Sequence, residues 1–311
     1  MFTCQNNILK EDIKFTDLSK YYKLSQCINP GKSGARVYLV EKNGQKYFCK
    51  IIKLIKKERF LKEIYKKTLP EYRDILIGCE LTQLKSKCFP KFYHWGYSEY
   101  LNPWNPKEKG QYLFMILQYL GHTNLKEILI NQMKDNVKTK TNFSLKDFKN
   151  KNFSLKDFRK TMFQILDCCA IANRKLGFVH NDFKPDNIMI KNKKPIIIDF
   201  GLSYTKKYKR RDDIITYLDK LSYFLVPIRK KTHIDFNKSY FSPKLFGSKF
   251  KIDNIELDRI IRLINVGERV FNGHEIILNE KDYKYLNRAS ISFASKLIFI
   301  KKLYEKKINT I

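Results

Sequence analysis

The sequence predicts an α+β fold in which a small antiparallel sheet comes first and a mainly helical region follows. Two β-rich runs within residues 35–55 are joined by residues 42–45, and the Asn43-Gly44 pair at this junction is typical of a tight hairpin. Another apolar run of strand character covers residues 112–117, and from Leu120 onward apolar residues recur mainly at helical intervals. The strands therefore precede most of the helices along the chain.

The helix predicted between these strands covers about residues 71–85. Thr68 and Glu71 have the spacing of a capping box, Pro70 suits the first helical turn, and apolar residues follow at helical intervals. Residues 97–111 include two Asn-Pro pairs and predict a surface loop before the next strand.

A short tandem repeat precedes the longest predicted helix. Residues 142–148 recur as residues 152–158, but two copies of so short a period do not predict a repeat architecture. In the second copy, Ser154 is predicted to be the N-cap of a helix that continues to Leu176.

The composition predicts a globular protein with an anionic partner. The chain has 311 residues, of which 43% are apolar and 14% aromatic, enough for a packed interior. Its formal net charge of +31 fits ATP, acidic protein, nucleic acid or a phospholipid surface, and an AT-rich coding genome is an equal explanation for the many lysines. No run in which basic residues alternate with stacking aromatics is evident. Nothing beyond the net charge therefore supports a nucleic-acid role.

Cysteine usage and hydropathy indicate a soluble intracellular protein, either cytoplasmic or nuclear. The seven cysteines have no Cys-x-x-Cys spacing and are predicted to be free buried thiols without a metal. No run approaches the roughly 18 apolar residues of a membrane span, and the first residues lack the order of a signal peptide.

Acidic and amide side chains surround a second predicted hairpin, whose strands are residues 187–191 and 195–198. Asp182 precedes this hairpin, Asn187 is its first residue, and Asp199 follows it. Phosphoryl transfer needs a carboxylate that accepts the proton of a hydroxyl and oxygen ligands that hold Mg²⁺ against phosphates. Asp182 is therefore predicted to be the base, and Asn187 and Asp199 to hold one nucleotide-bound Mg²⁺.

These residues resemble the motifs of the eukaryotic protein kinases. Residues 180–187, His-Asn-Asp-Phe-Lys-Pro-Asp-Asn, are similar to the catalytic loop H-R-D-L-x-x-x-N, and residues 199–201 match D-F-G. The resemblance implies a bilobal fold, with an N-terminal lobe over 1–117 and a C-terminal lobe over 118–311, and it implies ATP and Mg²⁺ as cofactors. Lys184 resembles the lysine of Ser/Thr kinases that contacts the transferred phosphate.

The same resemblance extends to the first strands. Residues 47–51 resemble the V-A-I-K strand with Lys50 as its lysine, which implies pairing with the ATP phosphates and with a glutamate of the next helix. Glu71 and Glu80 compete for that pairing, and Glu80 is preferred because capping already explains Glu71.

The predicted phosphate loop departs most from the family pattern. Gly31, Ser33 and Gly34 precede Val37 in a Ser-Gly-Ala turn that looks closer to the aminoglycoside phosphotransferases, which share the kinase fold. Glycines at such a turn let backbone N–H groups approach phosphates, although an ordinary hairpin turn is the other interpretation.

Residues 113–121 resemble the strand and hinge beside the adenine. Leu117 is then predicted to be the gatekeeper, and the backbone of Gln118 to Leu120 is predicted to bond the purine.

Other positions depart from ordinary protein kinases. Asn181 replaces the arginine of the catalytic loop, which predicts no activation by loop phosphorylation, and no Ala-Pro-Glu motif follows Gly201. Residues 206–211 are mostly basic and predict attraction of acidic or already phosphorylated substrates, unless they form only a solvated loop.

Parts of the chain also resemble haspin-type kinases, although the pair Phe200-Gly201 does not fit that group. Lys-, Asn- and Ile-rich kinases of this kind resemble those of large DNA viruses or reduced parasites; a viral kinase would act in the host-cell cytoplasm or virion.

The sequence thus predicts a Ser/Thr protein kinase that transfers the γ-phosphate of ATP to a protein. A small-molecule kinase of the aminoglycoside or choline type is the first alternative, favoured by the Ser-Gly-Ala turn and opposed by Lys184. The second is a catalytically silent basic scaffold, which the retained Lys50, Asp182, Asn187 and Asp199 argue against.

Overall fold

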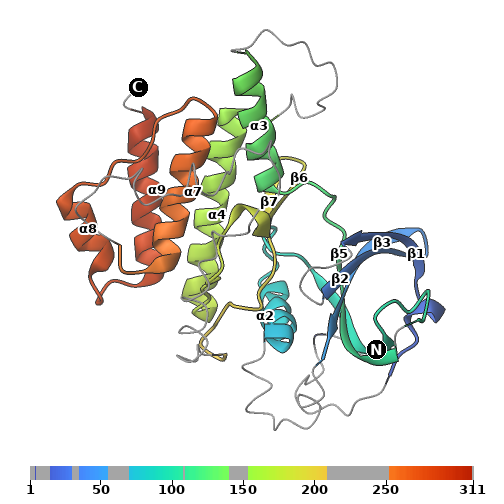
Figure 1. The fold of residues 1–311 in the computed structure, drawn as a ribbon. Coiled ribbons are helices and arrows are strands. Elements are labelled where there is room, and N and C mark those ends of the chain that lie inside the picture. The colour runs from blue at the N-terminus through green and yellow to red at the C-terminus, as the bar shows by residue number, and fades with distance from the viewer. Residues whose placement is uncertain are drawn as a thin grey trace. The chain divides into compact units, whose positions relative to one another are not determined.

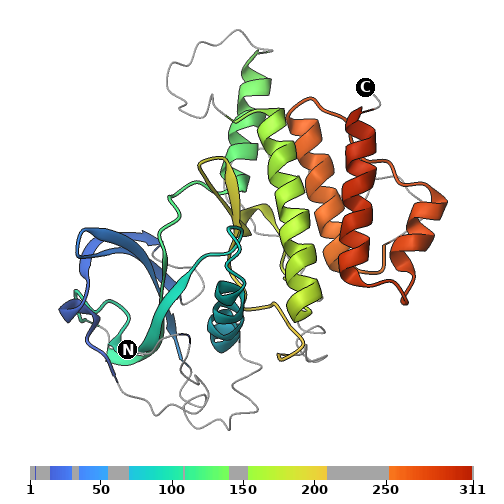
Figure 2. The same ribbon diagram turned by 180° about the vertical axis from the view of Figure 1, so that it is seen from behind.

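A computed structural model describes the chain as two compact units (Figures 1 and 2). The first unit comprises Met1–Gly121 and Ile196–Tyr208, and the second comprises His122–Pro195 and Lys209–Ile311. The structure describes residues 4, 15–29, 35–54, 70–107, 109–139, 153–208 and 252–309.

The first unit contains a five-stranded antiparallel sheet in the order β1-β2-β3-β5-β4. Its strands are β1 (Lys23–Asn29), β2 (Ala35–Lys42), β3 (Gln45–Lys53), β4 (Phe92–Tyr100) and β5 (Lys109–Gln118). The predicted hairpin is confirmed: Lys42 pairs with Gln45, and Asn43 and Gly44 occupy the left-handed region with φ of 51° and 73°.

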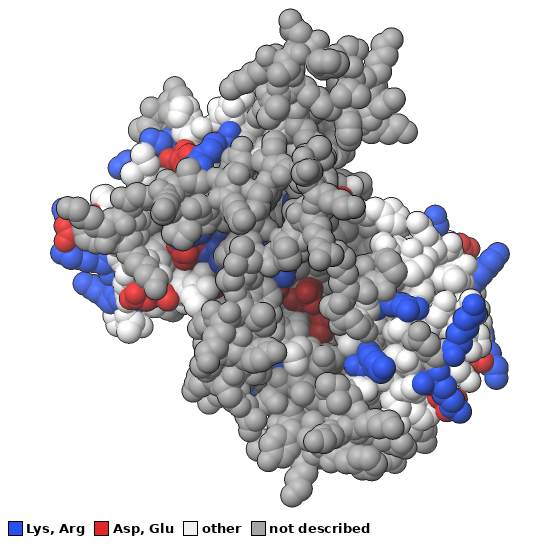
Figure 3. All heavy atoms as spheres, viewed as in Figure 1, with Lys and Arg blue, Asp and Glu red and all other residues white. Residues whose placement is uncertain are grey.

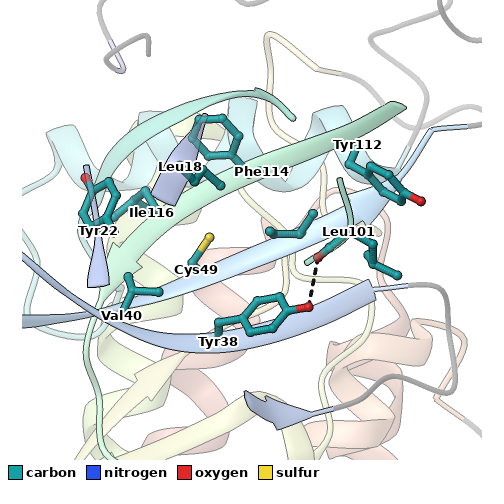
Figure 4. Packing of buried hydrophobic residues seen from close by; sticks show 10 residues of the cluster. Leu18, Tyr22, Tyr38, Val40, Cys49, Leu101, Tyr112, Phe114 and Ile116 are labelled. Atoms are coloured by element: carbon teal, nitrogen blue, oxygen red, sulfur yellow. Dashed lines mark hydrogen bonds between the residues drawn. The ribbon is translucent and has the colours of Figure 1, made fainter. Parts of the chain in front are cut away.

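The sheet has an aromatic core on one face. Tyr38, Cys49 and Ile116 alternate with residues of the opposite face and pack with Leu18 of the short helix η1 (Leu18–Lys20) (Figure 4). The hydroxyl of Tyr38 donates to the carbonyl of Leu101 at 2.9 Å, which satisfies the polar end of this buried ring. Lys50 follows Cys49 in β3 and therefore belongs to the other face.

Helix α2 (Pro70–Gln83) packs against β4 at close range. A Cβ at Gly78 would lie 2.2 Å from the ring of Phe92, so only glycine permits this approach. The hydroxyl of Thr82 accepts a hydrogen bond from the Phe92 N–H at 3.1 Å and donates to the Gly78 carbonyl at 2.9 Å. These contacts set the rotation of α2 about its own axis.

The prediction of free thiols was wrong for four cysteines: Cys88 and Cys168 are disulfide-bonded, and Cys4 and Cys79 form a disulfide with a Cα–Cα distance of 5.2 Å. The two residues are 75 positions apart, and folding brings Cys4 beside α2. Cys49 and Cys169 are free and buried, as predicted, whereas Cys27 is free but exposed.

The loop predicted over residues 97–111 is shorter than expected, because β4 continues to Tyr100, which pairs with Lys109. The remaining turn is anchored to the core. The indole of Trp104 lies 5.2 Å from the Tyr38 ring, and its N–H donates to the Tyr22 carbonyl at 2.8 Å.

The second unit is mainly helical, and α4, α7 and α9 lie side by side in both views (Figures 1 and 2). Its helices are α3 (Leu125–Thr139), α4 (Leu155–Leu176), α7 (Ile255–Val270), α8 (Glu280–Asn287) and α9 (Phe293–Asn309). Glu268 of α7 is fully buried and accepts hydrogen bonds from the guanidinium of Arg159 at 2.9 and 2.8 Å and from the Tyr304 hydroxyl. One buried carboxylate therefore joins these three helices.

Ser154 caps α4 as predicted, within a reciprocal capping box. The Ser154 hydroxyl accepts from the Asp157 N–H at 3.2 Å, and the Asp157 carboxylate accepts from the Ser154 N–H at 3.0 Å. The pKa of Asp157 is lowered to about 2, first by that backbone hydrogen bond and then by Lys193.

Ser154→Ala is expected to lower the free energy of unfolding by about 1 kcal/mol at neutral pH, because one N–H of the first turn loses its acceptor. Asp157 has a depressed pKa, so its stabilising contribution is present above about pH 4 and is lost as the pH falls toward about 2. Urea unfolding of both proteins between pH 7 and 3 measures the difference. A constant wild-type stability across the acid range would contradict the contribution assigned to Asp157.

On the face drawn in Figure 3, the described basic side chains lie at several places rather than in one patch. Exposed lysines on the sheet include Lys23, Lys46 and Lys53. Among the residues that the structure describes, no helix combines the length and apolar character of a membrane span.

Candidate active site

In the first unit, a lysine of the sheet binds two carboxylates. The ammonium of Lys50 lies 2.7 Å from Oδ2 of Asp74 on α2 and 3.0 Å from Oδ1 of Asp199. The other oxygen of Asp74 accepts the Phe200 N–H at 2.8 Å. Asp74 therefore bridges the lysine and the backbone beside Asp199.

Burial alone would lower the pKa of Lys50, but Asp199 and Asp74 outweigh it, and the pKa is raised. Lys50 consequently stays charged across the physiological range. A permanently charged ammonium held by two carboxylates is suited to binding phosphate oxygens.

Asp199 combines exposure with an unusual backbone conformation. Its φ is 68°, which is costly for most non-glycine residues, and its side chain is 45% exposed. The next residue, Phe200, is fully buried, with its ring centroid 6.1 Å from that of Phe89 and 6.2 Å from that of Phe92. The buried ring anchors the chain while the preceding carboxylate faces solvent.

In the second unit, the residues around Asp182 form a compact polar cluster. The ammonium of Lys184 lies 2.6 Å from Asp182 Oδ2, and the amide of Asn187 donates to the same oxygen at 3.0 Å and to the Asp182 carbonyl at 2.9 Å. The 3-10 helix η3 (Pro185–Asn187) brings Asn187 back toward Asp182 and leads into the strands β6 (Ile188–Lys191) and β7 (Lys194–Ile197). The predicted second hairpin is confirmed.

Helix α7 holds the backbone of this cluster. The buried Glu256 accepts the Phe183 N–H at 3.4 Å, and Arg259 donates to the Asn181 carbonyl at 2.9 Å. Burial raises the pKa of Glu256, while His180 and Arg259 act in the opposite direction. Asn181 has a φ of 60°, so α7 supports a turn in the left-handed region immediately before Asp182.

The residues predicted to hold Mg²⁺ have the appropriate oxygen donors. In phosphotransfer sites Mg²⁺ commonly takes one or two protein carboxylates together with water and phosphate oxygens, rather than a closed protein cage. The Asp199 carboxylate is accessible, and both hydrogen bonds of Asn187 use its amide nitrogen, so the amide oxygen is not consumed by them. Within the described part of the chain, no group of three or more His, Cys, Asp and Glu residues could form a metal cluster.

The predicted nucleotide-binding residues lie in the first unit or outside the described residues. Val37 pairs directly with Lys50 across β2 and β3, and Leu117 and Gln118 end β5. The Gln118 N–H already donates to the Lys91 carbonyl at 2.9 Å, so the N–H of Gln118 is engaged within the protein. Leu120 follows and is buried. Gly31, Ser33 and Gly34 fall outside the described residues.

The pairing of Lys50 with Glu80 was wrong. Asp74 binds Lys50, whereas the Glu80 carboxylate accepts the Thr205 hydroxyl at 2.9 Å. Burial raises the pKa of Glu80, opposed by Thr205 and Lys207. A search confined to glutamates missed Asp74. The residue that could have pointed to Asp74 is Gly78, which marks the packed side of α2. Asp74 lies one helical turn before Gly78 and therefore on the same side of the helix.

The sequence matches the protein kinase domain family over residues 22–249, which is more than half of the chain. The chain belongs to the protein kinase domain family. Its fold is also similar to a solved structure described as the Cydia pomonella Granulovirus kinase, PK-1. That similarity has a TM-score of 0.46 and 15% sequence identity, over 94% of this chain and 90% of that one.

Within this kinase domain, Asp74→Asn is expected to lower kcat/KM for ATP about ten- to hundredfold, because a charge-assisted hydrogen bond of about 1.5–3 kcal/mol is weakened. Glu80→Gln should change kcat/KM by less than about twofold, since glutamine can still accept from Thr205. Steady-state kinetics at varied ATP separate the two variants. A larger loss in Glu80→Gln than in Asp74→Asn would restore the original assignment.

Proposed function

We propose that this protein kinase domain transfers the γ-phosphate of ATP to serine or threonine of a protein substrate. The observation that carries the proposal is the cluster in which Lys184 and Asn187 bind one carboxylate oxygen of Asp182. This leaves Asp182 with a second oxygen for the hydroxyl of an acceptor, and it keeps a positive charge beside the base.

Each residue has a distinct role in the proposed reaction. Asp182 orients the acceptor hydroxyl and accepts its proton, and Lys184 compensates negative charge on the transferred group. Lys50 binds phosphate oxygens of ATP and is held in place by Asp74. Asn187 and Asp199 would supply oxygen ligands to Mg²⁺, which when bound neutralises charge that develops on the phosphates.

The binding of the nucleotide base and phosphates is assigned to residues around the sheet. Val37 lies opposite Lys50 and would cover the purine, and Leu117 is proposed as the gatekeeper. Since the Gln118 N–H is engaged by Lys91, the Gln118 carbonyl and the Leu120 N–H are the groups proposed to bond the purine edge. Gly31, Ser33 and Gly34 remain the proposed phosphate loop.

A protein acceptor is favoured over a small alcohol by Lys184, the position at which Ser/Thr kinases carry a lysine. Lys206 and Lys207 begin a basic run, residues 206–211, a few residues after Asp199. We therefore propose that acidic or already phosphorylated proteins are preferred, because opposite charges raise the rate of encounter.

Purified protein with Mg²⁺ and radiolabelled ATP tests this function directly. Acidic and basic model proteins and a panel of aminoglycosides and choline are offered as acceptors, followed by acid hydrolysis and separation of the phosphoamino acids. We expect phosphoserine or phosphothreonine, more on the acidic protein, and a rate of labelling at least about a hundredfold lower with Asp182→Asn. Label confined to small alcohols would favour the small-molecule kinase, and absence of label with ATP binding retained would favour the scaffold.

A further inference from the structure

Helix α2 contacts the chain after Asp199 at successive positions, all within the first unit. Beyond the Asp74 contact with the Phe200 N–H, a Cβ at Gly201 would lie 3.2 Å from the Pro70 carbonyl oxygen. Glu80, further along α2, accepts the hydroxyl of Thr205. The segment that follows Asp199 therefore runs along this helix.

Arg73 makes the central contact. Its Nε and Nη2 donate to the Ser203 carbonyl at 3.0 and 2.7 Å, and Nη2 also donates to the Tyr208 carbonyl at 3.0 Å. The Arg73 residue is only 2% exposed, and burial lowers its pKa. A buried guanidinium is unfavourable unless its hydrogen bonds are made, so its retention here requires these carbonyls to stay in place.

Hydrogen bonds within residues 200–208 form two turns in the bound segment. The Ser203 N–H donates to the Phe200 carbonyl at 3.0 Å, and the Thr205 N–H donates to the Tyr208 carbonyl at 3.1 Å. The Tyr208 N–H returns to the Thr205 hydroxyl at 3.2 Å. Arg73 thus donates to one carbonyl of each of these turns and joins both turns to α2.

Asp199 itself is in a conformation that needs support. Its φ of 68° has a cost of about 1–3 kcal/mol for such a residue, and it persists only where the surroundings hold it. The next residues supply that support, because Phe200 is bound by Asp74 and Ser203 by Arg73.

We propose that Arg73 is a positioning residue for Asp199: it fixes the segment 200–208 to α2 so that the Asp199 carboxylate is presented in its metal-binding orientation. The proposal rests on the proposed function for its kinetic consequences. Adjacent residues of one helix then have separate tasks, since Asp74 holds Lys50 and Arg73 holds the chain beyond Asp199.

Arg73→Met and Arg73→Lys test the proposal, with Arg159→Met as the matched control. Arg159 also donates in a bidentate manner to buried groups, but it lies in the second unit and has no role in the proposed reaction. Hydrogen exchange of the amides in residues 200–208 is measured without nucleotide. The Mg²⁺ concentration for half-maximal activity, kcat and the KM for protein substrate are then determined.

Arg73→Met is expected to raise exchange in residues 200–208 about tenfold or more, since buried carbonyls lose their donor. The half-maximal Mg²⁺ concentration should rise about tenfold and kcat should fall, with the KM for protein substrate unchanged. Arg73→Lys keeps the positive charge but not the planar arrangement of donors. It should change the exchange and the Mg²⁺ dependence less than Arg73→Met does. Arg159→Met should lower the melting temperature without changing either.

Unchanged exchange and unchanged Mg²⁺ dependence in both Arg73 variants would overturn the proposal. Equal effects from Arg159→Met would also overturn it, because the cause would then be general loosening. If no acceptor is phosphorylated by the wild type, the proposed function fails separately. Exchange together with the Mg²⁺ dependence of binding a fluorescent ATP analogue then decides the role of Arg73.

Discussion

Asp199→Asn is expected to abolish measurable phosphotransfer while the protein remains folded. The carboxylate is proposed to bind Mg²⁺, and charge stabilisation by a metal contributes several kcal/mol to the transition state. Because each 1.36 kcal/mol corresponds to tenfold in rate, kcat should fall by at least about 10³-fold.

The stability of Asp199→Asn should change little. The side chains of Lys50 and Asp199 are 20% and 45% exposed, and an ion pair of this kind contributes only about 0–1 kcal/mol. Asparagine also tolerates the left-handed backbone conformation that Asp199 adopts, so the turn need not rearrange.

Calorimetry and kinetics at several Mg²⁺ concentrations measure both effects. Asp167→Asn is the matched control, because Asp167 is 50% exposed and also pairs with a lysine, Lys301. It should retain wild-type kcat. Full activity of Asp199→Asn at ordinary Mg²⁺ concentrations would exclude Asp199 as a required ligand.

Asp182→Asn is expected to lower kcat about 10²- to 10⁴-fold, the usual contribution of a positioned general base. The KM for ATP should remain within about threefold, because the proposed role of Asp182 concerns the acceptor hydroxyl and not nucleotide binding. Asparagine has nearly the same shape and can still accept from Lys184, so the buried cluster is preserved.

Single-turnover measurements with saturating ATP distinguish a slower chemical step from slower product release. Titration with a fluorescent ATP analogue provides the control for nucleotide binding. An Asp182→Asn enzyme with kcat near that of the wild type would remove Asp182 from the role of base, whereas loss of ATP binding would indicate a structural role instead.

Much of the local structure could be predicted because it depends on neighbours in the chain. The Asn43-Gly44 hairpin needs residues that tolerate positive φ, and the Ser154 cap needs only an acceptor near the first turn of a helix. The cluster of Asp182, Lys184 and Asn187 is equally local, since all three lie within one loop and the short helix that follows it.

The partner of Lys50 could not be assigned in this way. Both Asp74 and Glu80 lie on α2, and which one reaches the lysine depends on the rotation of the helix about its axis. That rotation follows from the contact of Gly78 and Thr82 with Phe92, a residue of another strand. Only a prediction of that packing would have distinguished the aspartate from the glutamate.

The sequence by itself determined the order of strands and helices, which residues make up the kinase motifs, and the local turns around Asp182. The tertiary structure decided that Asp74 binds Lys50, that Cys4 meets Cys79 and that Arg73 holds the segment after Asp199. Local turns depend on a few adjacent residues, whereas these pairings join positions far apart in the chain, and their geometry follows from how the whole sheet packs against α2.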